Sequence, residues 1–168
     1  MFREMRRRNQ ELPAEACAEV LRRATCGVLA VDGDDGYPYA VSLSYVFDGE
    51  RIYFHCARSG HKLDALRRNP KASLCVVDQD QVVPEKFTTY FRSVIVFGTV
   101  RELADDAERR AAVELLGRRY WPDAPEGALE QEASSAWERL CVLEMTPEHI
   151  TGKEAVELAR SRRQAPEC

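Results

Sequence analysis

The sequence lacks the features that would place it in several specialised classes of protein. No apolar run approaches the ~20 residues that a membrane-spanning helix needs. Residues 1–13, MFREMRRRNQELP, carry basic side chains without a following apolar segment, so we do not expect a secretory signal. Low-complexity tracts are absent too, and 45% of the residues are hydrophobic, which is typical of a folded chain. We therefore expect a single domain that buries its core without the help of disulfides.

A basic excess is also missing. The formal net charge is -4 at pH 7, which argues against a nucleic-acid-binding protein. The arginine run at residues 6–8 has no accompanying aromatic pattern, so a solvated N-terminal arm over residues 1–11 is favoured over a nucleic-acid or lipid contact. We expect neither a nucleic acid nor a membrane as a partner.

The cysteines do not form the C-x-x-C pairs of zinc knuckles or thioredoxin-type redox sites. Cys26, Cys75 and Cys141 lie inside apolar runs, where cysteine packs as a small hydrophobic residue. The remaining three are Cys17, Cys56 and Cys168. Without an export signal, the set predicts free thiols in a reducing cytoplasm and no disulfide framework.

Hydrophobic periodicity predicts a chain that is mainly β with flanking helices. Helical patterns cover residues 13–24, 59–69, 105–119 and 129–137. Alternating or continuous apolar patterns predict strands at residues 26–31, 39–47, 51–56, 72–77, 90–103 and 139–146. Asp48-Gly49 indicates a tight hairpin, and Gly98 indicates a bulge. Six short strands with few helices favour an antiparallel barrel, because closure removes exposed sheet edges.

The stretch FHCARSGHKLDALRRNP, residues 54–70, concentrates the reactive side chains of the chain. His55, Cys56 and His61 are all residue types that ligate zinc. However, His55 and Cys56 are adjacent on a predicted strand, so their side chains point to opposite faces of the sheet. They cannot easily share one ion, and we predict no metal site.

The start of the following helix carries charge of an unfavourable sign. Ser59 is the predicted N-cap, and Pro70 disfavours helical geometry in the residue before it. His61 and Lys62 fall in the first turn, where a positive charge opposes the helix dipole by a few tenths of a kcal/mol. Two interpretations remain open: an anion held by these side chains and the helix N-terminus, or a solvated helix start.

Residues 39–76, YAVSLSYVFDGERIYFHCARSGHKLDALRRNPKASLCV, resemble the first half of the pyridoxamine 5'-phosphate oxidase-like flavoproteins, the FMN-binding split barrels. Residues 90–103, YFRSVIVFGTVREL, resemble the matching segment of their second half. Within that superfamily the sequence is most similar to the nitroimidazole-resistance (Nim-type) proteins, because it has their YFHC-type histidine, the YFRSVIVFG pattern and a late GKE at residues 152–154. The resemblance covers residues 12–154.

This resemblance implies a six-stranded Greek-key split barrel at residues 12–154, followed by a charged tail at residues 155–168. It further implies a homodimer with FMN at the subunit interface. The cofactor-binding residues that it implies are Val41, Ser42, Leu43, Ser44, His55, Cys56, His61, Lys62 and Ser93. His61 and Lys62 match two basic positions that hold the FMN phosphate, where the oxidases usually have arginine at the first.

Simpler interpretations of these residues stay open. Ser42 and Ser44 are also expected as outward-facing strand residues, and His55 as a hydrogen-bonded core histidine. Cys56 is more simply a packing residue, and we assign it no catalytic role.

The C-terminal region does not show the pattern of basic residues with which true pyridoxamine phosphate oxidases bind their substrate, so vitamin B6 synthesis is disfavoured. The Nim-type resemblance implies an FMN-dependent reductase of nitroaromatic or other electron-poor acceptors, in which the flavin carries the redox chemistry. His55 is then the predicted catalytic residue, as proton donor or acceptor-orienting group. The alternative is a flavin- or haem-binding protein without turnover, serving as a cofactor store or redox sensor.

Overall fold

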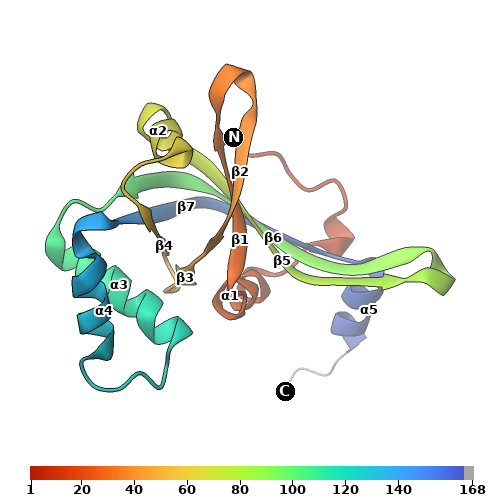
Figure 1. Ribbon diagram of the computed structural model, residues 1–168. Helices are drawn as coiled ribbons and strands as arrows, with labels where there is room; N and C mark the ends of the chain where they lie inside the picture. Colours follow the sequence, from red (N-terminus) through yellow and green to blue (C-terminus); the bar gives the residue numbers. More distant parts are fainter. Residues whose placement is uncertain (165–168) are drawn as a thin grey trace.

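The computed structural model describes residues 1–164 and shows one bent antiparallel sheet with helices around it (Figure 1). The strand order in the sheet is β2-β1-β5-β6-β7-β4-β3, and every neighbouring pair is antiparallel. The strands are β1 (Cys26–Asp32), β2 (Pro38–Ser44), β3 (Val46–Phe47), β4 (Ile52–Ala57), β5 (Lys71–Val83), β6 (Thr88–Glu102) and β7 (Leu140–Glu154). The expected fold class, mainly β with flanking helices, is therefore confirmed.

The expected count of six strands is wrong, because residues 39–47 form two strands instead of one. The chain bends at Tyr45, which separates β2 from β3. The Tyr45 N–H donates to the Tyr120 hydroxyl at 3.0 Å, and the Tyr45 carbonyl lies 2.6 Å from the same oxygen. A side chain thus replaces the ladder bonds that a continuous strand would make here.

The expected closed barrel is also corrected, since the sheet ladder stays open between β2 and β4. Strand β2 lies at one end of the strand order, and β4 and β3 lie at the other. Only Tyr45 connects β2 to β3 along the chain. Strand β3 is short and pairs with only two residues of β4, Ile52 and Tyr53. Beyond that corner, β2 and the remainder of β4 diverge, with α2 (His61–Arg68) at the open end (Figure 1). We call this unpaired region, bounded by Pro38–Ser44 and Phe54–Ala57, the split.

In residues 1–164 five α-helices surround the sheet, and four of them lie close to the ranges that the periodicity predicts. They are α1 (Ala14–Arg23), α2 (His61–Arg68), α3 (Asp106–Tyr120), α4 (Ala128–Ala136) and α5 (Val156–Gln164). Single turns of 3-10 helix lie at Arg8–Gln10, Asp34–Gly36, Pro84–Lys86 and Trp137–Arg139. Helix α5 occupies most of the segment 155–168, and Cys168 lies outside the described residues. Within residues 1–164, no helix combines the length and the apolar character that crossing a membrane requires.

The core lies between the inner face of the sheet and α1. Helix α1 buries Cys17, Val20 and Leu21 against inward-facing residues of the strands, as its apolar stripe predicts. Gly152 on β7 permits this approach, because a Cβ atom there would come within 2.5 Å of the Cys17 sulfur. The glycine of the GKE sequence is therefore needed for packing between α1 and β7.

Strands β5, β6 and β7 are longer than the sequence indicates. The polar segment around residues 78–89 continues both β5 and β6 into a projecting hairpin instead of forming a loop (Figure 1). The register shifts between Val77 and Gln79, and again between Phe97 and Gly98. The second shift confirms the bulge predicted at Gly98. Glycine is needed there because a Cβ atom would meet the Thr146 carbonyl oxygen at 2.2 Å.

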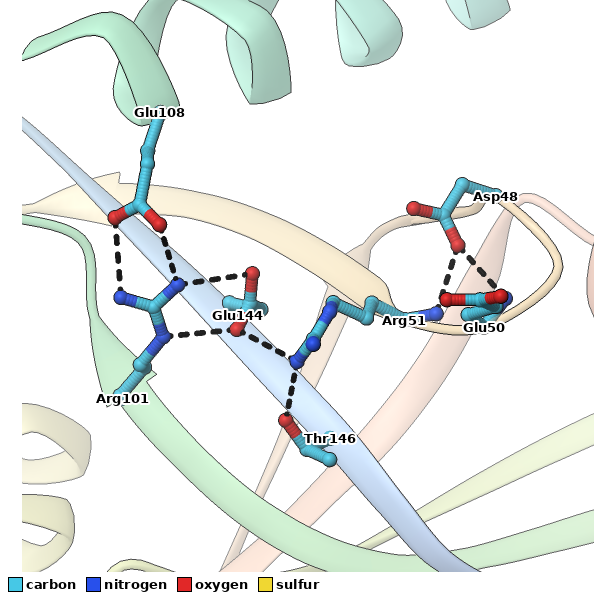
Figure 2. Close-up of polar contacts among 7 residues, drawn as sticks. All are labelled: Asp48, Glu50, Arg51, Arg101, Glu108, Glu144 and Thr146. Carbon is cyan, nitrogen blue, oxygen red and sulfur yellow. Dashed lines mark hydrogen bonds and ion pairs between the residues drawn. The ribbon is translucent and has the colours of Figure 1, made fainter.

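Two glutamates on β7 are buried, and each is neutralised by two arginines. Glu144 accepts from Arg101 Nε at 2.8 Å and from Arg51 at 3.2 Å, and Arg101 also binds Glu108 of α3 (Figure 2). Glu154 is 0% exposed and accepts from other arginines on β6 and α5. These ion pairs fasten the middle strands of the sheet to the helices on either side.

Candidate functional site at the β2–β4 split

Strand β2 places the four residues Val41–Ser44 at a free edge of the sheet. Val41 and Leu43 pack against the core, whereas Ser42 and Ser44 are exposed on the outer face. Because β2 pairs only with β1, every second residue turns its backbone N–H and C=O toward the split. The alternative expectation for Ser42 and Ser44, outward-facing strand residues, therefore describes their orientation correctly.

Helix α2 begins at the open end of the split without a side-chain cap. The N-cap is Gly60, with φ of 133°, and the predicted Ser59 cap is wrong. A left-handed φ favours glycine, so the chain reverses at Gly60 before Ser59 can reach the helix amides. The Gly60 carbonyl accepts from the N–H groups of Leu63 and Asp64, which leaves the His61 and Lys62 N–H groups without an acceptor among the described residues.

The two predicted phosphate-binding side chains differ in their surroundings. The His61 ring lies 4.1 Å from the Tyr39 ring of β2, and its Nε2 lies 3.3 Å from an Asp34 carboxylate oxygen. That nitrogen is shielded from solvent, yet its alignment with Asp34 is too poor for a hydrogen bond. Lys62 is half-buried and forms no ion pair within residues 1–164. The start of α2 thus holds one unpaired cation and one orphaned imidazole nitrogen.

His55 and Cys56 point to opposite sides of β4, as their adjacency predicts. His55 is exposed and lies opposite Val142 of β7. It points to the face of the sheet against which α3 packs elsewhere along β4 and β7. Cys56 packs against the core and lies opposite Cys141. The expectation of a core histidine does not fit the exposure of His55. Among the described residues, no group of three or more His, Cys, Asp and Glu side chains could hold a metal.

Ser93 lies apart from the other predicted residues. It sits on the exposed face of β6, opposite Val77 on one side and Lys153 on the other. Strands β1 and β5 separate β6 from β2, which corresponds to about 14 Å at the usual interstrand spacing. On the other side only β7 lies between β6 and β4, but Ser93 is opposite Lys153, whereas the β4 residues at the split pair with Leu140–Leu143 at the other end of β7. A single chain therefore does not bring Ser93 to the split.

The thiols of Cys56 and Cys141 interact, a feature that the sequence did not reveal. A hydrogen bond from Cys141 and the nearby charge of Lys62 lower the pKa of Cys56 to about 7. The same contact, burial and the neighbouring Glu102 carboxylate raise the pKa of Cys141. No local motif could have indicated this pair, because it depends on the register between β4 and β7.

Three comparisons place this geometry among known proteins. The sequence profile described as pyridoxamine 5'-phosphate oxidase matches residues 13–154. An uncharacterised protein of Rhizobium meliloti (strain 1021) is 32% identical over 128 residues, which cover 73% of this chain and 80% of that protein.

Two solved structures share the fold. A putative 5-nitroimidazole antibiotic resistance protein of Bacteroides thetaiotaomicron superposes with a TM-score of 0.69 at 19% identity, covering 85% of each chain. An FAD-binding protein of Mesorhizobium loti superposes with a TM-score of 0.64 at 26% identity, covering 87% of this chain and 97% of the other. Because the family profile spans most of the sequence, this chain belongs to the pyridoxamine 5'-phosphate oxidase family.

Proposed function

We propose that the protein binds FMN at the split and uses it to reduce small electron-poor acceptors, including nitroaromatic compounds. Membership of the pyridoxamine 5'-phosphate oxidase family supports a flavin as the cofactor. The similar fold of a putative nitroimidazole resistance protein supports the choice of acceptor. The observation that carries the proposal is the uncapped start of α2 beside the free edge of β2, joined through the Tyr39–His61 contact.

The residues at the split fit a phosphate ester of a planar ring. Free N–H groups at a helix start, together with an unpaired Lys62, suit a dianionic phosphate. The exposed edge of β2 offers backbone donors and acceptors to the polar rim of the ring. His61 would have to exchange its Asp34 neighbour for the phosphate. FMN supplies the electron-transfer chemistry when bound.

A second copy of the chain is the proposed partner. The outer face of the sheet exposes Val28, Val77 and Ile95, by 38%, 59% and 36% respectively. Neighbouring exposed apolar side chains on one sheet face are typical of a protein–protein contact. Ser93 lies on the same face, opposite Val77. We therefore assign Ser93 to the site of the partner copy, since it is too far from the split of its own chain.

His55 is the proposed proton donor for the acceptor. It is the exposed titratable side chain of β4, next to the free end of that strand at the split. A positioned general acid contributes about 10²-fold or more to the rate. The test is anaerobic reduction of a nitroimidazole by the FMN-loaded protein with a reduced nicotinamide, comparing the native chain with His55→Ala.

We expect His55→Ala to reduce the rate by about 10²-fold while FMN stays bound. His149→Ala is the matched control, and its rate should be unchanged. The His149 ring stacks on the Phe2 ring, with the ring centres 4.7 Å apart, and lies away from the split. Equal rates for His55→Ala and the native protein would remove His55 from the mechanism. A protein that holds FMN but reduces no acceptor would instead be a cofactor store or sensor.

A further inference from the structure

Cys56 and Cys141 form a directly opposed pair on two hydrogen-bonded antiparallel strands. The register between β4 and β7 aligns them, and both side chains face the core side of the sheet. Both are free cysteines, and each thiol shifts the pKa of the other. Opposed residues in such strands have Cα atoms about 4.5–5.5 Å apart, which lies inside the range that a disulfide spans. Bond formation therefore needs no change of register.

Cys141 lines a polar pocket of about 300 Å³. The charged residues of the lining are Arg58, Arg67, Glu102 and Arg109. The Cys141 sulfur lies 3.7 Å from a Glu102 carboxylate oxygen. Glu102 is in turn fixed by Arg67 through bonds of 2.7 and 2.9 Å. A cysteine pair that served only for packing would not require a fixed carboxylate at one sulfur.

The charges around the two sulfurs make them unequal. The charges of Lys62 and Arg67 favour the Cys56 thiolate. The Glu102 carboxylate opposes a negative charge on either sulfur, but it contacts only Cys141, at 3.7 Å from its sulfur. Cys56 is also half-exposed, while Cys141 is 7% exposed. Reactive cysteines combine thiolate character with access, so Cys56 is the sulfur that an oxidant meets first.

We propose that Cys56 and Cys141 are a peroxide-sensitive dithiol that closes into a cross-strand disulfide. The Cys56 thiolate attacks the O–O bond of hydrogen peroxide, its sulfur is oxidised to a sulfenic acid, and hydroxide leaves and is protonated to water. Cys141 then passes its thiol proton to Glu102, and its sulfur displaces hydroxide from the sulfenic acid. That hydroxide takes the proton from Glu102. Two thiols and one hydrogen peroxide thus give one disulfide and two waters.

The resulting bond is expected to be reversible. Directly opposed residues have Cβ atoms about 4.5–5.5 Å apart, against about 3.5–4.5 Å in a disulfide, so β4 and β7 must draw together slightly. Strained disulfides are the readily reduced ones, and a cellular thiol suffices to reopen them. This reaction involves no flavin, so it is independent of the function proposed above.

The test is peroxide treatment of the reduced full-length protein, followed by thiol titration and mass mapping of unreduced peptides. We expect the loss of two thiols in each chain, and one linked pair of peptides that carries Cys56 and Cys141. Dithiothreitol should restore both thiols. In Cys141→Ser, the sulfenic acid of Cys56 should accumulate and react with dimedone, and no linked peptide should form.

Cys75→Ser is the matched control, because Cys75 lies opposite Val28 and Ile95 and should not affect the linkage. If Cys141→Ser does not fold, Cys56→Ser serves instead, and its Cys141 should stay reduced under the same treatment. Retention of all thiols in the native protein overturns the proposal. Linkage through Cys26, Cys75 or Cys168, or dimedone labelling at a cysteine other than Cys56, overturns it equally.

Discussion

The middle of the sheet and the split are built on different principles. Strands β5, β6 and β7 pair along nearly their whole length, and carboxylates buried beside them are matched by arginines. At the split, β2 and the end of β4 have no second partner, and α2 starts without a cap. Free backbone groups and an unpaired lysine therefore collect in the region that contributes least pairing to the sheet. Such unsatisfied groups are what a ligand can bind.

The comparison predicts that substitutions in the two regions have different consequences. In the paired strands, removing a charge leaves a buried partner with fewer compensating bonds and lowers the free energy of unfolding. At the split, removing a charge should weaken ligand binding and leave the free energy of unfolding nearly unchanged. Arg92→Leu in the paired strands and Lys62→Ala at the split test this difference, and Tyr120→Phe tests the bend between the two regions.

Arg92→Leu should destabilise the protein most. Arg92 bonds Glu154 at 3.1 Å and Asp78 at 3.3 Å, and the side chains of these carboxylates are 0% and 10% exposed. Its removal leaves Glu154 with Arg162 alone and Asp78 with Arg23 alone. Two charged hydrogen bonds to buried carboxylates are lost, so the free energy of unfolding should fall by about 3 kcal/mol, measured by urea denaturation. Arg51→Leu is the matched control, with an expected loss of at most about 1 kcal/mol, because Glu144 keeps its two bonds from Arg101 (Figure 2). Equal losses in both variants would contradict this explanation.

Tyr120→Phe tests the corner where the split begins. The Tyr120 hydroxyl accepts from the Tyr45 N–H and lies 2.6 Å from the Tyr45 carbonyl oxygen. Without it, backbone groups at the bend lose their partner, and the free energy of unfolding should fall by about 2 kcal/mol in thermal or urea denaturation. Tyr37→Phe removes a hydroxyl from a residue that is 76% exposed and should have no measurable effect. An unchanged Tyr120→Phe variant would show that the bend does not depend on this hydroxyl.

Lys62→Ala should change binding and not stability. Loss of one charge-assisted contact to the phosphate is worth about 1.4 kcal/mol, so the Kd for FMN should rise about tenfold. The free energy of unfolding should stay within about 0.5 kcal/mol of the native value. Lys71→Ala removes the same charge from an exposed position on β5 and should leave the Kd unchanged. The same increase in both lysine variants would indicate non-specific attraction instead of a phosphate site at α2.

The sequence predicts the elements of this fold better than their connections. Periodicity locates α1, α2 and α3, and the hairpin at Asp48-Gly49, because these depend on local patterns. The break at Tyr45 was missed, since the hydroxyl that stabilises it comes from Tyr120, far along the chain. The sequence does not predict the long β5–β6 hairpin, because polar side chains at its exposed end look like a loop although the backbone there is paired.

The candidate site shows the same limit. Adjacency on a strand was enough to place His55 and Cys56 on opposite faces. The unfavourable charge in the first turn of α2 also draws attention to Lys62, which forms no ion pair within residues 1–164. The neighbours of His61, Asp34 and Tyr39, were not foreseen, because they depend on how the turn before β2 folds over α2. The position of Ser93 likewise depends on the strand order, which local patterns do not reveal.

Titration of the purified, cofactor-free protein with FMN tests the central claim most directly. Quenching of flavin fluorescence should saturate at one FMN for each chain, and the Lys62→Ala variant should bind about tenfold more weakly. Riboflavin, which has the same ring without the phosphate, should bind more weakly than FMN to the native protein and equally well to both proteins. Failure to bind FMN, or an affinity for FMN no higher than that for riboflavin, would contradict a flavin phosphate site at the split.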